Sequence, residues 1–401
     1  MSSVKGWKKC RVRDICNLGR GRVISAQEIE RNPGVYPVYS SQSLNNGKMG
    51  SIDTFDFNGE CITWTTDGAY AGTVFYRSGK FNCTNVCGTL HAKEDVCIPF
   101  IAYKLSTLTK NYVSYVGNPK LMNGVMANIE LFIPISKAEQ AKIAEILSTV
   151  DKAIEQTEVL VVKQQRIKTG LMQDLLTRGI DEHGTLRSEK THKFKDSPLG
   201  RIPVEWNVQP LSELAHVDRG KFTHRPRNDP HFYGGEFPFI QTGDVTSMIG
   251  RRVYTYTQTL NARGTTVSKE FPRGTIAITI AANIADTAIL GIPMYFPDSI
   301  VGAVVSPPNT TRFIELMLRR WKPILERLAS QSAQKNINLE VLRPLLIPIP
   351  GPEEQQRIGN LYNRLDINQE RMEQKLLKLR SLKTALMQDL LTGKKRVIVL
   401  S

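Results

Sequence analysis

The feature that most constrains this chain is an internal repeat. Residues 168–177 read Lys-Thr-Gly-Leu-Met-Gln-Asp-Leu-Leu-Thr, and residues 383–392 repeat them with a single change from Gly to Ala. The same offset relates Asp151 to Asp366 further upstream. Because the match holds at one offset over about 40 residues, it indicates a duplicated unit rather than a chance likeness.

Each copy of the repeat is predicted to form one long helix. Apolar or permissive residues recur alternately three and four positions apart, which is the spacing of a heptad seam. Neither copy contains a proline within 139–177 or 353–392, and Ser136 and Gly351-Pro352 stand where helices would begin. A helix of about 39 residues is about 58 Å long, which exceeds the needs of a small domain. The predicted seam residues are Ile143, Leu147, Val150, Ile154, Val161, Leu171, Leu175, Ile358, Tyr362, Leu365, Met372, Leu376, Leu379, Leu386 and Leu390.

Two related helices in one chain pair most simply about a two-fold axis, which predicts an antiparallel coiled coil. Lys168 and Lys383 occupy equivalent positions of the two seams. A polar residue in a seam can fix the register and orientation of the helices. Alternatively, these lysines lie at the edge of the seam and extend their ammonium groups into water.

The segments that precede the helices form two weakly related units. Each opens with a tryptophan, Trp7 or Trp206, and continues to a basic-Gly-basic triplet, but the sequences between such anchors share almost nothing. Both contain short β-rich runs with Gly, Asn and Pro turns, and residues 314–321 suggest one of the few helices. The predicted fold class is therefore α/β (α+β), with two mixed α/β domains, two long helices and a pseudo-two-fold internal repeat. The predicted segments are a first domain at 1–136, a helix at 137–178, a polar linker at 179–205, a second domain at 206–350, a helix at 351–393 and a tail at 394–401.

The charge balance favours a polyanionic partner. Lys and Arg number 53 against 38 Asp and Glu, a net charge of +15, and nucleic acid is the commonest partner of such chains. No stretch is apolar enough to span a bilayer and the N-terminal residues lack a signal-peptide core, so a cytoplasmic location is expected. In that reducing compartment the six cysteines would remain thiols.

Basic and polar loops supply the candidate DNA contacts. The glycine of each triplet is expected to form a tight turn that projects both charges toward phosphates, although an ordinary solvated turn is the alternative. Residues 117–120 and 331–336 precede the last strand of each domain, and we interpret them as DNA-facing rather than plain surface loops. The predicted DNA-binding residues are Arg20, Arg22, Asn118, Lys120, Arg219, Lys221, Arg225, Arg227, Gln334, Lys335 and Asn336.

No catalytic or metal site is predicted. The spacing of Cys83, Cys87 and His91 is a weak zinc pattern, and buried free thiols are the preferred interpretation. Trp64 suits a core position better than a base-stacking one. The nearest approach to an adenine methyltransferase motif, at residues 306–309, fails at both ends, and no phosphate-binding G-x-x-x-x-G-K-[ST] loop is present.

Over essentially its full length the chain resembles the specificity subunits of Type I restriction–modification enzymes. The resemblance rests on Ile-Pro-x-x-x-x-Glu-Gln at 133–140 and its second copy, and on the repeated decamer that ends each helix. Gly-Arg-Ile-Pro-Val-Glu-Trp at 200–206 and Tyr-Pro-Val-Tyr-Ser-Ser at 36–41 are also typical of that family.

The resemblance implies a non-catalytic DNA-reading subunit. Two target recognition domains would each read one half of a bipartite, asymmetric site, and the long helices would set the unread spacer. Two copies of a methyltransferase subunit and the restriction subunits would be its protein partners. S-adenosylmethionine, ATP and Mg²⁺ would be bound by those partners, and no cofactor is expected in this chain.

Three alternatives remain open. The chain could serve another methyltransferase–nuclease system, which co-purifying partners would reveal. A coiled-coil scaffold that binds only proteins would lack the steep salt dependence of phosphate contacts. A catalytic nuclease would cut DNA unaided in the presence of magnesium.

Overall fold

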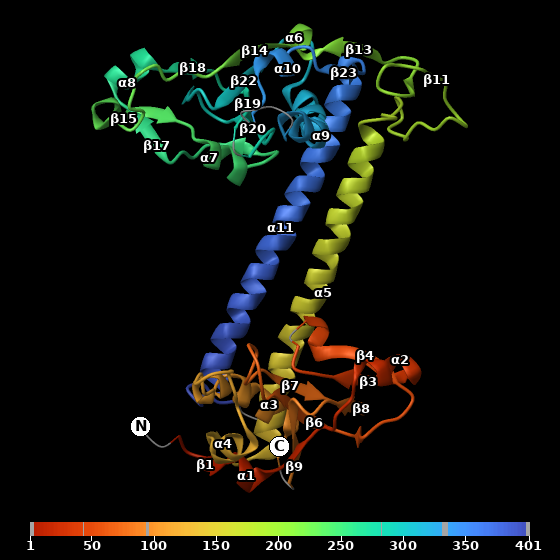
Figure 1. Ribbon diagram of the computed structural model, residues 1–401, viewed down its shortest axis with the longest axis vertical. Coiled ribbons are helices and arrows are strands. Elements are labelled where there is room, and N and C mark those ends of the chain that lie inside the picture. The colour runs from red at the N-terminus through yellow and green to blue at the C-terminus, as the bar shows by residue number, and fades with distance from the viewer. Residues whose placement is uncertain (1–3, 43, 94–95, 282, 331–335, 398–401) are drawn as a thin grey trace. The chain divides into compact units, whose positions relative to one another are not determined.

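The computed structural model describes residues 4–42, 44–93, 96–281, 283–330 and 336–397, and the chain folds into two compact units (Figure 1). Unit 1 comprises Met1–Leu160 and Met372–Ser401, and unit 2 comprises Val161–Arg371. Each unit therefore contains one predicted domain together with part of both long helices. Each long helix contributes residues to both units. The sequence prediction instead treated each helix as a segment separate from the two domains.

Unit 1 is built on two four-stranded sheets. The first has the order β2(Cys16–Arg20), β9(Cys87–Ala92), β6(Cys61–Thr65), β7(Val74–Arg77), and all its neighbours are antiparallel. The second has the order β4(Lys48–Ile52), β3(Pro33–Tyr39), β8(Lys80–Cys83), β5(Phe57–Asn58), with β3 and β8 parallel. A separate antiparallel pair joins β1(Trp7–Arg11) to β10(Glu130–Pro134). The helical elements are α1(Val12–Ile15), α2(Ala26–Arg31), η1(Leu44–Gly47), α3(Ile98–Ser106), η2(Thr109–Tyr112) and α4(Asn123–Asn128).

Unit 2 repeats this topology. Its first sheet has the order β14(Ala215–Arg219), β22(Ile300–Val305), β19(Ile276–Thr279), β20(Thr287–Leu290), β16(Arg252–Val253). Its second has the order β17(Gln258–Leu260), β15(Tyr233–Phe239), β21(Met294–Phe296), β18(Lys269–Phe271), with β15 and β21 parallel. The pair β13(Asn207–Pro210) and β23(Leu346–Ile349) corresponds to β1 and β10. The helical elements are α6(Leu211–Leu214), η3(Pro230–Phe232), α7(Thr242–Ser247), α8(Ala262–Val267), α9(Thr311–Ser330) and α10(Leu339–Leu342).

The predicted fold class is confirmed, and the duplication extends further than the sequence indicated. Four strands follow the same order in each of the two main sheets of both domains, although the sequences between the anchors diverge, and unit 2 adds β16 as a fifth strand beside β20. The helix predicted at 314–321 is α9, which extends beyond that range at both ends. No helix among the described residues combines the length and apolar character that a membrane crossing requires.

The long helices are α5(Lys137–Leu175) and α11(Pro352–Leu390), each of 39 residues. Ser136 directly precedes α5, and its hydroxyl accepts a hydrogen bond from the backbone N–H of Glu139 at 3.4 Å. Proline is the first residue of α11, where its missing N–H and fixed φ suit a helix start. Both helices end three residues before the ends predicted at 178 and 393. The structure places every predicted seam residue in a buried or half-buried position.

Within each unit the two helices run antiparallel and are joined by an equivalent ion pair. In unit 1, Lys383 Nζ lies 2.6 Å from Asp151 Oδ1, and in unit 2 Lys168 pairs with Asp366. The repeat maps one pair onto the other. The Lys168 and Asp366 side chains are only 14% and 16% exposed, which favours the register-fixing role over free extension into water.

The repeated Glu-Gln pair near the start of each long helix binds other segments of the same unit. In unit 2 the Glu354 carboxylate accepts hydrogen bonds from Arg187 Nη1 and Nη2 at 2.5 and 3.1 Å, Ile180 N at 2.9 Å and Trp206 Nε1 at 3.3 Å. In unit 1 Glu139 accepts from Arg396 Nε and Nη2 at 2.6 and 2.7 Å. In each unit, therefore, a glutamate in the first turn of one long helix binds an arginine in the segment that follows the other long helix.

The neighbouring glutamines make matching contacts. Gln140 accepts a hydrogen bond from Cys97 N at 2.9 Å, and Gln355 accepts one from Thr310 N at the same distance. Cys97 and Thr310 directly precede α3 and α9, so each glutamine ties a domain helix to a long helix. The Glu-Gln motif thus has a structural role.

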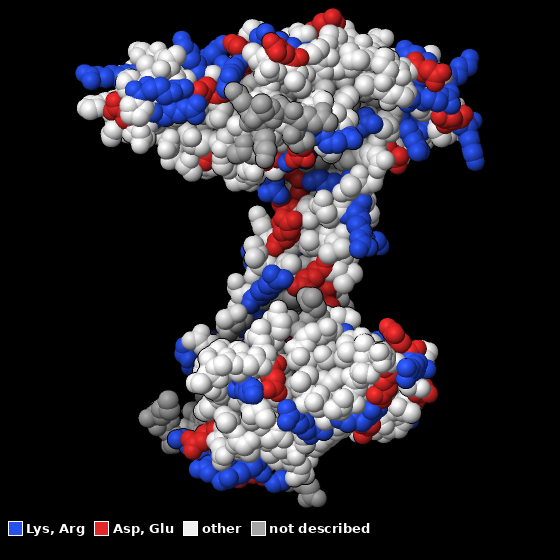
Figure 2. Space-filling view, in the orientation of Figure 1, with Lys and Arg blue, Asp and Glu red and all other residues white. Residues whose placement is uncertain are grey.

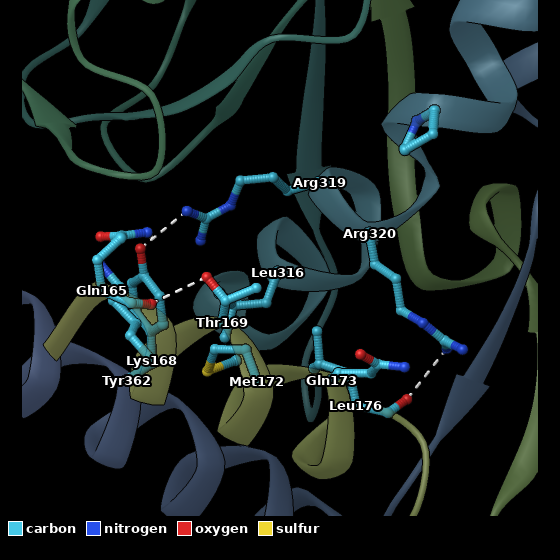
Figure 3. Close-up of a pocket in the computed structure, with 11 residues that line it drawn as sticks. Gln165, Lys168, Thr169, Met172, Gln173, Leu176, Leu316, Arg319, Arg320 and Tyr362 are labelled. Carbon is cyan, nitrogen blue, oxygen red and sulfur yellow. Dashed lines mark hydrogen bonds between the residues drawn. The ribbon is translucent and has the colours of Figure 1, made fainter. Parts of the chain in front are cut away.

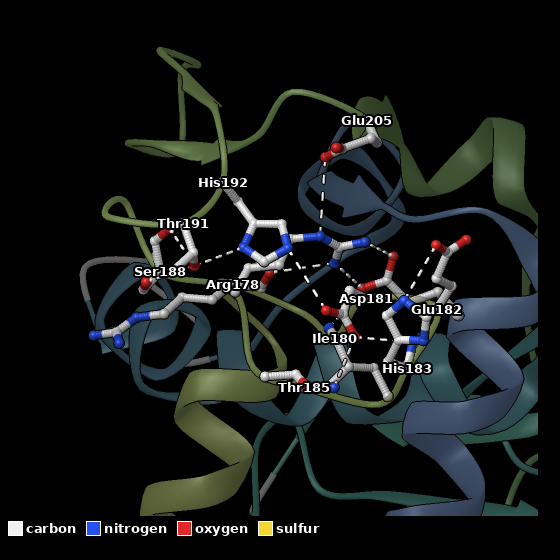
Figure 4. A network of polar contacts seen from close by, with 12 residues as sticks. Arg178, Ile180, Asp181, Glu182, His183, Thr185, Ser188, Thr191, His192 and Glu205 are labelled. Atoms are coloured by element: carbon white, nitrogen blue, oxygen red, sulfur yellow. Dashed lines mark hydrogen bonds and ion pairs between the residues drawn. The ribbon is translucent and has the colours of Figure 1, made fainter.

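The predicted linker at 179–205 is folded onto unit 2. Asp181 accepts hydrogen bonds from the backbone N–H groups of His183 and Thr185 at 3.0 and 2.8 Å, and His192 lies beside the same carboxylate (Figure 4). Within it, β11(Phe194–Lys195) pairs with β12(Ile202–Pro203). These contacts give the connection a defined path despite its polar composition.

Candidate nucleic-acid interface

An arginine ends the first strand of the main sheet in each domain, and both arginines make the same bond. Arg20 Nε donates to the carbonyl oxygen of Asn85 at 2.5 Å, and Arg219 Nε donates to that of Asp298 at 2.6 Å. Each carbonyl lies two residues before the strand that pairs with the arginine's own strand, β9 or β22. Both side chains are exposed, so the bond orients the rest of a guanidinium that faces solvent.

The glycines of the basic triplets allow close backbone approach, which corrects the predicted tight turn. A Cβ on Gly21 would lie 2.1 Å from the carbonyl oxygen of Cys83, and one on Gly220 would lie 2.1 Å from that of Pro297. Neither glycine has a positive φ. Only a residue without a side chain fits where the end of β2 or β14 crosses the end of β8 or β21.

The other predicted arginines lie in ion pairs that the local sequence did not indicate. Arg22 lies 3.0 Å from Asp56 and 2.7 Å from Glu28, and its hydrogen bond to Glu28 raises the pKa of the guanidinium. Two carboxylates therefore neutralise Arg22, which weakens its case as a phosphate contact. It instead joins the loop after β2 to α2.

In unit 2 three arginines converge on one aspartate. Arg225 and Arg227 lie 3.0 and 2.5 Å from Asp298 Oδ2, while Arg219 is bonded to the Asp298 carbonyl oxygen. One carboxylate cannot balance three guanidinium groups, so this cluster retains positive charge. Figure 2 shows Lys and Arg gathered on the part of unit 2 that carries α8 and β15 in Figure 1. An arrangement that orients several exposed arginines suits phosphate recognition.

The remaining predicted contacts of unit 1 lie beside Arg20. The backbones of Lys120 and Asp67 form an isolated antiparallel β-bridge, and Asp67 Oδ2 lies 3.3 Å from Arg20 Nη2. Asn118, two residues earlier, is exposed in the same loop. The structure thus brings together the two stretches that the sequence proposed separately, 20–22 and 117–120.

Unit 2 has the same arrangement as far as it is described. The Ile337 N–H donates to the Ile280 carbonyl oxygen at 3.1 Å, matching the bond of 2.8 Å from Leu121 N to Thr66 O in unit 1. Lys221 is exposed next to Arg219, and Asn336 is half-buried. The predicted contacts Gln334 and Lys335 lie outside the described residues.

Sequence reasoning missed the acidic partners and the carbonyl anchors. Asp298, Asp67 and Asn85 lie far along the chain from the arginines they contact, and no local motif marks them. Asn85 and Asp298 become recognisable as equivalents only when the domains are aligned through β9 and β22. That alignment requires the strand order, which the divergent sequences conceal.

The cysteine-rich part of unit 1 is a packed core. Cys61, Cys83 and Cys87 are buried, and burial raises the pKa of the Cys61 thiol to about 12. His91 Nε2 lies 3.6 Å from the Cys61 sulfur, but no potential metal-binding group of three or more side chains occurs among the described residues. Trp64 is fully buried and donates to the Leu121 carbonyl oxygen at 2.9 Å, so it is a core residue and not a base-stacking one.

A pocket in unit 2 lies between α9 and the long helices (Figure 3). Arg319 donates to the Tyr362 hydroxyl at 2.8 Å, and Arg320 donates to the Leu176 carbonyl oxygen at 3.2 Å. Arg319 also pairs with Glu315 at 3.3 Å, and Lys168 pairs with Asp366. Most of the positive charge in this pocket is therefore compensated internally.

Comparisons with known protein families give a consistent result. Residues 4–164 and 203–380 match the model of the Type I restriction modification DNA specificity domain. The chain is 52% identical over 144 residues to the N-terminus of a putative Type I specificity subunit of Mycoplasma pneumoniae, which covers 35% of this chain and 76% of that relative. It is 27% identical to the specificity subunit of a Type I restriction enzyme of Methanocaldococcus jannaschii, covering 98% of this chain and 93% of that one. It spans about half the length of several other M. pneumoniae relatives.

Solved structures share the fold. The S subunit of a Type I restriction–modification system from M. genitalium superposes with a TM-score of 0.67 at 15% identity, covering 100% of this chain and 98% of that one. The HsdS subunit from Thermoanaerobacter tengcongensis gives a TM-score of 0.50 at 15% identity, covering 98% of each chain. At these identities the likeness is one of architecture.

Proposed function

The chain belongs to the family of Type I restriction–modification DNA specificity subunits, and on this premise we propose that it reads both halves of a bipartite, asymmetric DNA site. Unit 1 would bind one half and unit 2 the other. The observation that carries the proposal is the shared anchoring of Arg20 and Arg219 in two domains whose other loops differ. Equivalent arginines would position each domain on phosphates, and the divergent loops would read different bases.

The long helices would set the distance between the two half-sites. A 39-residue helix is about 58 Å long at 1.5 Å rise per residue, which corresponds to between one and two turns of B-DNA. The Lys383–Asp151 and Lys168–Asp366 pairs fix the register of the helices within each unit. A fixed register suits a spacer of one defined length.

Two methyltransferase subunits would dock on this frame, and restriction subunits would join them. A duplicated pair of helices offers each copy an equivalent surface, as expected for a pseudo-two-fold assembly. S-adenosylmethionine, ATP and Mg²⁺ would be bound by those partners. A specificity subunit of another methyltransferase–nuclease system is the second candidate, and the subunits that co-purify with the chain decide between them.

The test is to map methylated adenines in the host genome with and without the gene for this chain. The proposal predicts a split motif with a fixed gap that disappears on deletion and returns on complementation. Methylation that does not depend on the chain contradicts the proposal.

Variants of the anchoring arginines test the interface directly. Replacing Arg20 or Arg219 with glutamine should weaken binding to all duplexes and reduce the salt slope by about one per lost phosphate contact. Arg13, an exposed arginine of α1, provides the matched control, because Arg13→Gln should leave the slope unchanged. If DNA binding by the unmodified chain and its partner subunits does not depend on salt concentration, the result would favour a scaffold that binds only proteins.

A further inference from the structure

A loop of unit 1 that includes Lys120 presents two apolar side chains to solvent. Tyr115 is 68% exposed and Val116 is 93% exposed. The loop is closed by Ser114 and Lys120, which exchange two backbone hydrogen bonds of 2.9 Å. Gly117, with φ of +74°, allows the tip to turn between them. The apolar pair is therefore held on a closed loop before any partner binds.

The surroundings of this tip carry positive charge and a further aromatic ring. The Gly68 N–H donates to the Pro119 carbonyl oxygen at 2.9 Å, which ties the loop to the turn after β6. Tyr70 in that turn is 50% exposed, and Lys110 Nζ donates to the Ala71 carbonyl oxygen at 2.9 Å. Together with Lys120, these residues make an apolar tip beside cationic groups.

This combination matches the chemistry of a DNA duplex. Phosphates at the rim of a groove attract lysine and arginine, whereas thymine methyl groups and base edges inside the groove accept apolar side chains. Apolar side chains next to cations are also the means by which proteins open base steps. An apolar protein partner would gain nothing from the cations, so the charge favours DNA as the occupant.

Resting on the proposed function, we propose that Tyr115 and Val116 enter a groove of the duplex and contact bases of the half-site bound by unit 1. Arg20 and Lys120 hold the flanking phosphates and contribute affinity for any sequence. The tip contributes discrimination between sequences and adds nothing to the salt dependence, because its side chains carry no charge.

The test uses the chain co-purified with its methyltransferase subunits and synthetic duplexes carrying the mapped site. The first variant combines Tyr115→Ser with Val116→Ser. The second carries Val116→Ser alone, and the Val116 side chain is so exposed that this change should not disturb folding. Val35, 81% exposed on β3, provides the matched control Val35→Ser. Affinity is measured for the intact site and for duplexes in which one half-site or the other is scrambled.

The double variant should lose about tenfold or more of its preference for the intact site, as expected for one good base contact. The loss should concern one half-site only, with the affinity for scrambled DNA, the salt slope and the Val35→Ser control unchanged. An unchanged preference overturns the inference. So does loss of the methyltransferase subunits from the purified variant, which would assign the tip to a protein interface. If the parent complex does not distinguish the intact site from scrambled DNA, the proposed function itself fails.

Discussion

The Glu354 contacts make the sharpest prediction about stability. The Glu354 and Arg187 side chains are 7% and 8% exposed, and the Glu354 carboxylate also accepts hydrogen bonds from Ile180 N and Trp206 Nε1. Glu354→Ala would leave a buried arginine without its main counter-charge. The other carboxylate near Arg187, that of Glu205, is 4.0 Å away and 55% exposed, so it compensates little.

Removing one partner of a buried ion pair costs about 3–5 kcal/mol, and we expect Glu354→Ala to fall in this range. Glu354→Gln retains one acceptor oxygen but removes the charge and the acceptor of the second oxygen. Because the lost charge still leaves Arg187 uncompensated, we expect Glu354→Gln to cost about 3 kcal/mol, the lower end of the range for a broken buried ion pair.

Hydrogen exchange measured by mass spectrometry is the appropriate assay, because a chain of two units need not unfold in one step. Exchange near the start of α11 and in residues 179–187 reports the local opening free energy of unit 2. Glu353 is the matched control: it is 94% exposed and lies 3.8 Å from Arg357, so Glu353→Ala should change the free energy by no more than about 0.5 kcal/mol. Equal exchange in the two alanine variants would refute the reasoning.

The equivalent ion pair of unit 1 allows the effect of burial to be compared within the same chain. Glu139 makes the equivalent contact with Arg396, but the Arg396 side chain is 40% exposed. Water can solvate that guanidinium when its partner is lost, so Glu139→Ala should cost less than Glu354→Ala. An equal or greater loss in unit 1 would show that burial of the arginine does not control the energy.

Two further predictions concern the helix pair and the thiols. Lys168→Met should destabilise its unit more than Lys383→Met. Asp366 is 16% exposed and keeps Arg251 Nε at 3.8 Å, which is beyond hydrogen-bond distance, whereas Asp151 is 35% exposed and keeps a hydrogen bond of 2.7 Å from the Tyr103 hydroxyl. Hydrogen exchange in the two helices measures this, and the reverse order would contradict it. At pH 8 the native chain should resist alkylation at its four buried cysteines until it unfolds, because burial excludes the reagent and raises the pKa of their thiols. Burial also raises the pKa of Cys10 and Cys97, but these two thiols are only half-buried and should react first. Mass spectrometry of alkylated peptides checks the order. The four buried cysteines are Cys16, Cys61, Cys83 and Cys87.

The helices could be predicted from the sequence because their signal is periodic and occurs twice. The spacing that runs through Ile143 and Leu147 recurs at Ile358 and Tyr362, and all four side chains are buried. A helix keeps its contacts within a few residues, so pattern and structure remain closely linked.

The common topology of the two domains could not be predicted in the same way. Their strands are short, and the pairings join segments far apart in the chain, such as β2 with β9 and β3 with β8. Many different sequences can form such a sheet, so the sequences of the two domains diverged while the order of their shared strands was kept. The basic residues of the site were identifiable by composition, but their partners were not. Asp298, for example, lies 71 positions from Arg227.

We propose that the paired helices measure a distance while the two domains read bases. This proposal is tested by deleting residues 154–160 and 374–380, which removes one heptad from each helix within unit 1 and keeps the seam in phase. Seven residues at 1.5 Å each shorten the pair by about 10 Å, or about three base pairs. Adenine methylation mapped in cells carrying this variant should be absent at sites with the original gap, and any methylated sites should have the same two halves about three base pairs closer. Methylation retained at the original gap would contradict the account.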